Sequence, residues 1–153
     1  MSMRIFKLLV AAIVVSAAVC VNAQTKDGKP EIAQITETLM HYIEGTANGQ
    51  PERLKKAFHP SFNLYTVTKE GGLRTRSGEK YIALFKEGRK SNRVGRIIAI
   101  DFEKDAATAK VEILVPSGRI YTDYFLLLKY EGSWKIVHKS YTSREVPKQK
   151  TKK

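Results

Sequence analysis

The residues of this sequence that could do chemistry are its histidines, aspartates and tyrosines. The chain has three histidines, His41, His59 and His138, and no two of them have the spacing typical of metal ligands. There is also no Gly-x-Ser-x-Gly elbow, phosphate loop or dinucleotide fingerprint. We therefore expect no metal and no cofactor. The remaining candidate is an acid–base pair, Asp123 with His138, which could move a proton if the two side chains meet.

Two runs rich in aromatic and β-branched residues hold this pair. They flank Glu131-Gly132-Ser133 and predict an antiparallel hairpin over residues 119–144. Its register matters because a slip of one residue moves every side chain to the other face. A two-residue turn pairs Tyr130 with Ser133 and leaves Asp123 diagonal to His138 on one face. A three-residue turn pairs Tyr130 with Trp134, sets His138 opposite Leu126 and points Asp123 the other way.

The three-residue turn is the one we favour, because it separates apolar side chains from lysines. One face then holds Tyr124, Leu126, Leu128, Trp134, Ile136 and His138, and the other holds Lys129, Lys135 and Lys139. Burying such a face stabilises a fold by roughly 1.5–3 kcal/mol for each large side chain. This register predicts an interior His138 without Asp123 as its partner. His138 is then either a general base or ligand-binding group, or a core histidine.

The chain before the hairpin predicts helices and more strands. Apolar residues at three- and four-residue steps from Ile32 predict a helix with Pro30 in its first turn, which Asn48-Gly49 ends. Pro51 opens a shorter helix that His59-Pro60 ends. Strands follow at 62–68 and 73–76, and Ser77 is the expected N-cap of a third helix that runs to about Gly88. Two further strands, 96–102 and 108–115, precede the hairpin. This order predicts an α+β domain, with helices over the concave face of a curved antiparallel sheet and a conical cavity between them.

The N-terminus predicts export. Arg4 and Lys7 precede an apolar run of twelve residues, 8–19, and Val21-Asn22-Ala23 fits a cleavage site, so we expect a signal peptide over 1–23. A lipoprotein signal at Cys20 and an uncleaved anchor are the alternatives. The domain division is then a leader at 24–30, one domain at 31–145 and a disordered basic tail at 146–153. Because Cys20 is the only cysteine, the mature chain has no disulfide.

Positive charge is in excess. The whole chain has 27 basic and 15 acidic residues, a net charge of +12, and removal of Arg4 and Lys7 leaves 25 against 15, or +10. A loop between the third helix and the sheet concentrates this charge in a basic patch of Lys86, Arg89, Lys90, Arg93 and Arg96. Such a patch can bind a phosphate or an acidic group, and a solvated loop is the alternative. No aromatic residues interleave with it, so we expect no nucleic acid partner.

Three motifs carry a resemblance to a known family. They are Phe58-His59-Pro60-Ser61-Phe62, Thr122-Asp123-Tyr124-Phe125 and Gly132-Ser133-Trp134-Lys135-Ile136-Val137. With the order of elements, they make residues 31–145 resemble the nuclear transport factor 2-like superfamily, and within it the bacterial "putative lumazine-binding" family. The resemblance implies a cone-shaped domain that often dimerises through its sheet, and a flavin- or lumazine-like ligand. The superfamily contains isomerases, dehydratases and hydrolases as well as binding proteins, so the fold does not choose among them.

Three functions follow as hypotheses. The preferred one is an exported, non-catalytic domain that binds a small hydrophobic or aromatic ligand or assembles as a homodimer. Its ligand-binding candidates are Tyr42, His59, Phe62, Tyr65, Tyr124, Trp134 and His138, where His59 could instead cap a turn. The second is an isomerase, dehydratase or hydrolase that uses His138 and the tyrosines. The third is an interaction with an anionic envelope surface through the basic patch and tail.

Overall fold

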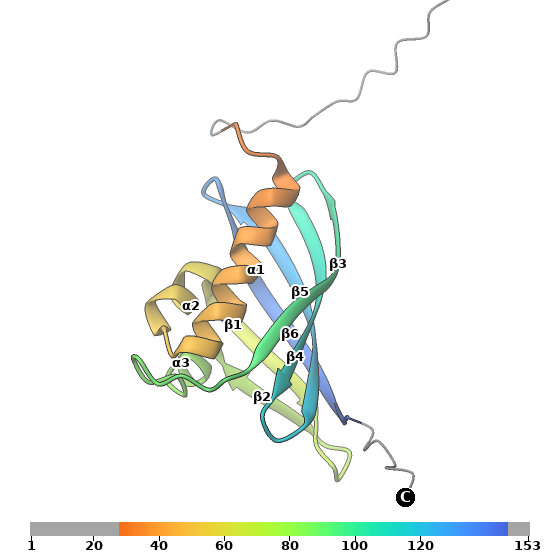
Figure 1. Cartoon of the computed structure of the whole chain (residues 1–153). Helices are drawn as coiled ribbons and strands as arrows, with labels where there is room; N and C mark the ends of the chain where they lie inside the picture. The colour runs from red at the N-terminus through yellow and green to blue at the C-terminus, as the bar shows by residue number, and fades with distance from the viewer. Residues whose placement is uncertain (1–27, 147–153) are drawn as a thin grey trace, which may run out of the picture.

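The computed structural model describes residues 28–146. The expected signal peptide and almost all of the expected basic tail lie outside these residues. Three helices, α1 (Glu31–Asn48), α2 (Pro51–Ala57) and α3 (Gly78–Ile82), cover one face of a six-stranded sheet (Figure 1). Within residues 28–146 no helix is long and apolar enough to cross a membrane. The predicted α+β cone is therefore confirmed.

The sheet is antiparallel except for one pair of strands. Its order is β2-β1-β6-β5-β4-β3, and only β1 and β6 run parallel. The strands are β1 (Phe58–Val67), β2 (Leu73–Ser77), β3 (Val94–Glu103), β4 (Ala106–Val115), β5 (Arg119–Tyr130) and β6 (Ser133–Glu145). The four consecutive antiparallel strands expected from the sequence are β3 to β6. Figure 1 shows α1 lying across them, with the β4–β5 turn at the lower, wide end and the β3–β4 and β5–β6 turns at the upper end.

Two boundaries differ from the sequence prediction. β1 begins at Phe58, directly after α2, because the parallel pairing of Phe58 with Ile136 makes this segment extended four residues earlier than expected. α3 ends at Ile82, although apolar residues continue to Phe85. Ser77 does cap α3, since its side chain accepts a hydrogen bond from the Lys80 amide at 3.4 Å.

The β5–β6 hairpin has a two-residue turn, so the favoured three-residue turn was wrong. Tyr130 pairs with Ser133, and the turn residues Glu131 and Gly132 both have positive φ, 48° and 78°. This pair of left-handed residues matches the right-handed twist of a hairpin. A bulge at Val137 then shifts the register, so that Leu127 pairs with Ile136 but Leu126 pairs with His138.

The bulge decides which side chains face the helices. Before it, Trp134 and Ile136 point into the core, and after it Lys139 does so, while His138 points to the outer face. Strand β5 contributes Asp123, Phe125 and Leu127 to the inner face and Tyr124, Leu126 and Leu128 to the outer face. The core therefore lies between α1 and the inner face, and includes Ile35, Leu39, Tyr42, Leu54, Phe58, Phe62, Val111, Phe125, Leu127, Trp134 and Ile136.

Candidate functional site

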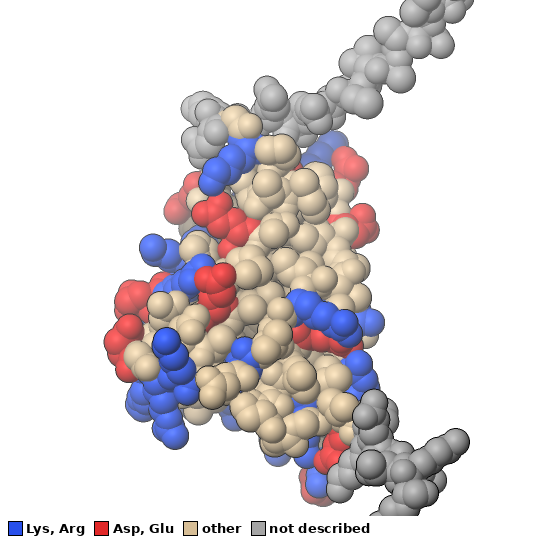
Figure 2. Space-filling view, in the orientation of Figure 1, with Lys and Arg blue, Asp and Glu red and all other residues tan. Residues whose placement is uncertain are grey.

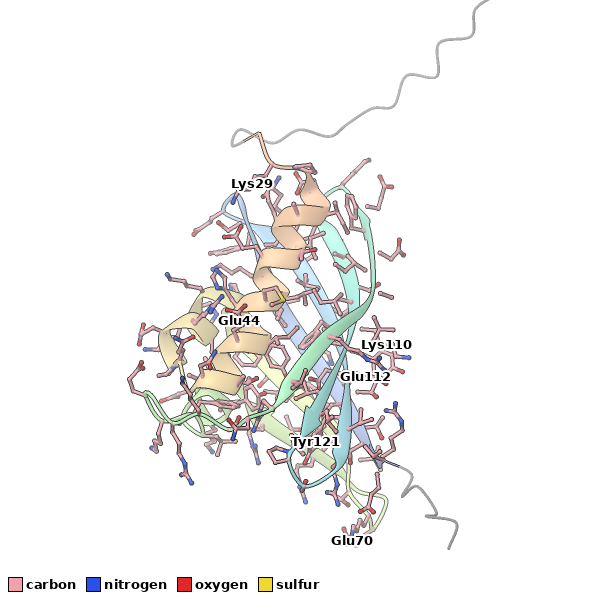
Figure 3. All side chains as sticks on the ribbon, viewed as in Figure 1. Lys29, Glu44, Glu70, Lys110, Glu112 and Tyr121 are labelled. Atoms are coloured by element: carbon pink, nitrogen blue, oxygen red, sulfur yellow. The ribbon has the colours of Figure 1, made fainter. Side chains whose placement is uncertain are left out.

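A cavity of about 530 Å³ lies between the inner face of the sheet, the C-terminal half of α1 and the loop that follows α3. Its inner end is formed by Tyr42, Tyr81 and Asp123, and its walls include Tyr121, Tyr141 and Phe85. Figure 3 places Tyr121 toward the wide end of the cone. Aromatic rings therefore line much of the cavity, which is the composition of a site for a flat or aromatic molecule.

The floor of the cavity is a buried network of four polar side chains. The Tyr42 hydroxyl donates to Asp123 Oδ2 at 2.6 Å and accepts from Lys139 Nζ at 2.8 Å and from the Tyr81 hydroxyl at 3.4 Å. Lys139 Nζ lies 2.9 Å from Asp123 Oδ1, and the two side chains are 5% and 1% exposed. Each buried charge thus has an opposite charge beside it, as buried charges require.

The network fixes the protonation of its members. Burial and the charge of Asp123 raise the pKa of Tyr42 well above its ordinary value, so Tyr42 remains a neutral phenol. Burial alone would lower the pKa of Lys139, but the neighbouring Tyr81 and Asp123 raise it. Lys139 is therefore a fixed ammonium group. It also lies 4.8 Å from the ring centroid of Tyr42 and 5.1 Å from that of Tyr81, within the range of cation–π attraction.

Cations surround the mouth of the cavity. They are Arg76 from β2 and, from the loop after α3 and its approach to β3, Lys86, Arg89, Lys90 and Arg93. None of these five is in an ion pair with a carboxylate of residues 28–146. Figure 2 shows Lys and Arg side chains gathered at the lower left, where Figure 1 places this loop. An anionic group at the mouth would meet unneutralised positive charge.

The loop that carries Lys86, Arg89, Lys90 and Arg93, here called the basic loop, is hydrogen-bonded to the end of α1. Ser91 donates from its amide to the Ala47 carbonyl at 2.8 Å, and the Gly88 amide donates to the Gly49 carbonyl at 2.9 Å. Gly49 has φ 62°, and a Cβ there would lie 2.3 Å from the Lys86 carbonyl oxygen, so only glycine permits this close approach. The loop cations thereby lie at the C-terminus of α1, where the helix dipole favours positive charge.

The predicted basic patch divides at β3. Lys86, Arg89, Lys90 and Arg93 line the cavity mouth, and Arg93 also lies over the Phe85 ring with its guanidinium 5.5 Å from the ring centroid. Arg96 does not join them, because its guanidinium binds Glu112 at 2.6 Å on the outer side of the sheet. Glu112 appears on that side, with Lys110, in Figure 3.

The seven predicted ligand-binding residues do not lie together in one site. Tyr42 is at the cavity floor, and Phe62 and Trp134 are in the core. Tyr65, Tyr124 and His138 are on the outer face, where the rings of Tyr65 and His138 stack at 4.8 Å. His59 packs edge-on to the ring of Tyr130 at 4.8 Å, and its Nδ1 accepts from the Ser61 amide at 3.1 Å, which is the turn-capping role expected as its alternative.

The expected interior position of His138 was therefore wrong, and so was the expected outward direction of Asp123. The two-residue turn puts Asp123 on the same face as Trp134, and the bulge at Val137 puts His138 on the opposite face, because side-chain alternation along β6 fails by one position beyond the bulge. Sequence reasoning also missed Tyr81, Arg76, Tyr121, Tyr141 and Lys139 as site residues. The alternation of Asp123 with Phe125 and Leu127 was the one available signal that the aspartate faces inward.

A second buried cluster lies at the narrow end of the cone. Glu31, at the start of α1, accepts from the Trp134 indole at 2.6 Å and from Lys129 Nζ at 2.5 Å. Burial would raise the pKa of Glu31, but the hydrogen bonds from Lys129 and Trp134 lower it. This cluster joins the start of α1 to the β5–β6 hairpin. The cavity mouth lies at the other end of α1. In residues 28–146, no group of three or more His, Cys, Asp and Glu side chains could hold a metal ion.

Comparison with known proteins places the chain in a family. Residues 30–142 match the family described as "Putative lumazine-binding". The chain belongs to this family. A nuclear transport factor 2-like protein of unknown function from Shewanella baltica is 26% identical, with a TM-score of 0.68 over 76% of this chain and 95% of that one. A similar protein from Methylobacillus flagellatus is 27% identical, with a TM-score of 0.66 over 80% of this chain and 97% of that one.

One curated relative has a named activity. The chain is 24% identical over 115 residues to a protein named "Aldolase FrzH" from Cladobotryum sp., a match that covers 74% of this chain and 91% of the relative. The resemblance inferred from the three sequence motifs is thus confirmed at the level of the family and the superfamily. The family's description supports a small-molecule ligand.

Proposed function

We propose that this protein binds a small aromatic molecule carrying a negative charge, in the cavity between α1 and the sheet, without catalysing a reaction. The observation that carries this proposal is the ring of five cations without carboxylate partners in residues 28–146, at the mouth of an aromatic-lined cavity. The aromatic walls would hold a planar ring system, and the cations would hold its acidic group. A flavin or lumazine bearing a phosphate or carboxylate has both features, in line with the family's description.

Catalysis is the second candidate, and one observation favours it. Asp123, Tyr42 and Tyr81 line the cavity and belong to a charged buried network, which is the kind of environment in which enzymes tune proton transfer. The curated relative named as an aldolase adds weight to this candidate. Its residues would be these three, because His138 lies on the outer face and cannot reach the cavity.

Self-association through the outer face of the sheet is part of the proposal. Tyr124, Leu126 and Leu128 are 48%, 49% and 46% exposed there, on alternate positions of β5. Adjacent apolar side chains in the middle of a sheet are a typical interface between copies of a chain. The oligomeric state in solution, measured by sedimentation with and without Leu126→Lys, tests this: a dimer that the substitution dissociates supports the interface, and a wild-type monomer contradicts it.

Export completes the proposal. The apolar run over residues 8–19 and the small residues before Gln24 support a cleaved signal peptide, so the mature domain would act outside the cytoplasm. Contact of the basic mouth with an anionic surface is the alternative role for its charge. Binding of the protein to vesicles with and without anionic lipid, measured with the cavity empty and with a ligand in it, distinguishes the two roles. A surface contact would require anionic lipid and would persist when a ligand occupies the cavity.

The direct experiment compares two ligands that differ only in a phosphate. We expect FMN to bind the purified mature chain, with its fluorescence quenched by the tyrosines, and riboflavin to bind at least about tenfold more weakly because it lacks a charge-assisted contact. Arg89→Glu should remove most of this preference. Lys110→Glu makes the same charge change on the outer face and should leave it intact. No binding of FMN, or an equal loss in both variants, would contradict the proposed site.

A further inference from the structure

We infer that the inner end of the ligand is a hydrogen-bond donor, an N–H or O–H group that binds Asp123 at the cavity floor. This inference builds on the proposed anionic ligand and specifies its chemical class. It concerns the end of the molecule that lies farthest from the cations at the mouth. The argument is a count of the donors and acceptors that the floor presents.

The hydrogen-bond donors at the cavity floor already have acceptors within the network. The hydroxyl hydrogen of Tyr42 is used by Asp123 Oδ2 at 2.6 Å, and the Tyr81 hydroxyl donates to Tyr42 at 3.4 Å. Lys139 donates to Tyr42 at 2.8 Å and lies in an ion pair with Asp123. Lys139 is itself almost fully buried and is not part of the cavity lining. A ligand carbonyl that reached this end would therefore meet no free hydroxyl hydrogen of Tyr42 or Tyr81, and the ammonium of Lys139 lies behind the lining residues.

The acceptors of the floor are not exhausted. Asp123 lines the cavity, and its two carboxylate oxygens can accept about four hydrogen bonds. Oδ2 receives one, from Tyr42, and no hydrogen bond of suitable geometry reaches Oδ1, although Lys139 Nζ lies 2.9 Å from it. Oδ1 is thus a buried acceptor with capacity to spare. Buried polar atoms in this state are costly until a partner arrives.

The two ends of the cavity together select one kind of molecule. The mouth favours an anion, and the floor favours a donor and disfavours an acceptor, since a carbonyl or ether oxygen would face a carboxylate. The matching class is an acidic aromatic heterocycle with a ring N–H, amino or hydroxyl group away from the acid. An imide N–H of a flavin or lumazine ring meets this requirement. Acids whose far end is only an ether or a ketone do not.

The test uses FMN and its N3-methyl analogue, which keeps the phosphate but lacks the imide hydrogen. We expect methylation to weaken binding at least about tenfold in the wild-type protein, the loss of one hydrogen bond to a charged group. In the double variant Asp123→Leu with Lys139→Met, which removes both charges together, the two ligands should bind within about twofold of each other. Leucine is no smaller than aspartate, so a purely steric effect of the methyl group would persist in this variant.

The outcomes separate this inference from the proposed function. Equal binding of FMN and N3-methyl-FMN by the wild-type protein, with riboflavin still weaker, would overturn the inference and leave the anion site in place. A methylation effect that survives in the double variant would also overturn it. Failure of FMN to bind at all contradicts the proposed function itself. A thermal melt of the double variant, compared with wild type, verifies that it is folded.

Discussion

Asp123 of β5 and Lys139 of β6 form a buried ion pair, with Oδ1 and Nζ 2.9 Å apart on the inner face of the sheet. They meet because the bulge at Val137 brings Lys139 opposite Phe125, two residue pairs away from the pairing of Asp123 with Tyr141 and on the same face of the sheet. Tyr42 of α1 bridges both charges. A helix and two strands are thus joined at the floor of the candidate site.

Removing one partner of this pair should be costly, and removing both should not. Lys139→Met leaves the Asp123 charge buried without a counter-ion, so we expect it to destabilise the fold by about 3–5 kcal/mol. Asp123→Leu combined with Lys139→Met should lie within about 1 kcal/mol of wild type or exceed it. Urea unfolding measures both. As a control, Arg144→Met breaks the surface pair with Glu112, in which Arg144 is 52% exposed, and should cost less than about 1 kcal/mol. A double variant as unstable as Lys139→Met would contradict this account.

Stability should fall in alkali. The raised pKa values of Lys139 and Tyr42 mean that the folded protein keeps two protons that the unfolded chain releases near pH 10. Their contribution is complete below about pH 10 and is lost as the pH rises through the folded-state values. Unfolding free energy measured from pH 8 to pH 11.5 should decline more steeply in the wild type than in the double variant that lacks Asp123 and Lys139. Parallel curves for the two proteins would be evidence against the predicted coupling.

The narrow end of the cone should respond to acid. Because the pKa of Glu31 is lowered in the folded state, its contribution is present above about pH 4.5 and is lost as the pH falls through the folded-state value. Glu31→Gln should reduce stability at pH 7 but flatten the loss of stability between pH 5 and pH 3. Trp134 fluorescence reports the same change, since its indole donates to Glu31. An acid profile unchanged by the substitution would refute this role.

The β5–β6 turn should depend on one glycine. Gly132 has φ 78°, so Gly132→Ala places a side chain in the left-handed region, at a cost of about 1–2 kcal/mol. Gly72→Ala is a matched control, because Gly72 lies in another hairpin loop, has no positive φ, and its new Cβ would meet only Thr68 Oγ1 at 3.5 Å. Thermal melts of the two variants compare them directly. Equal melting temperatures would show that the turn is not held in this conformation.

The fold was readable from the sequence because its signals are local. The apolar steps of α1, the Ser77 cap and the hairpin signal around Gly132 each depend on a few neighbouring residues, and each predicts an element that the structure has, although the turn at Gly132 has two residues and not three. The basic loop could be recognised for the same reason, since its cations are adjacent in the chain. Its attachment to Gly49 at the end of α1 depends on a contact across about forty residues and has no local signal.

The floor of the site could not be predicted because it depends on a bulge. Counting from the turn gives the correct face for Trp134 and Ile136 but the wrong face for every residue of β6 after Val137. Lys139 also looked like a surface residue, since a lysine is almost never buried without a partner, and its partners lie on α1, α3 and β5. His138 appeared interior by the same error. The candidate functional groups of the cavity are therefore Asp123, Lys139 and two tyrosines, and His138 is not one of them.

The most direct test of the central claim is to locate bound FMN on the protein by NMR. The mature chain, labelled with ¹³C on its aromatic rings, would be titrated with FMN and its ring signals followed. We predict the largest shifts for the cavity rings of Tyr81, Tyr121 and Tyr141, and little change for Tyr124 and His138 on the outer face. Shifts confined to Tyr124, Tyr65 and His138, with the cavity rings unaffected, would place binding on the outer face and contradict the account.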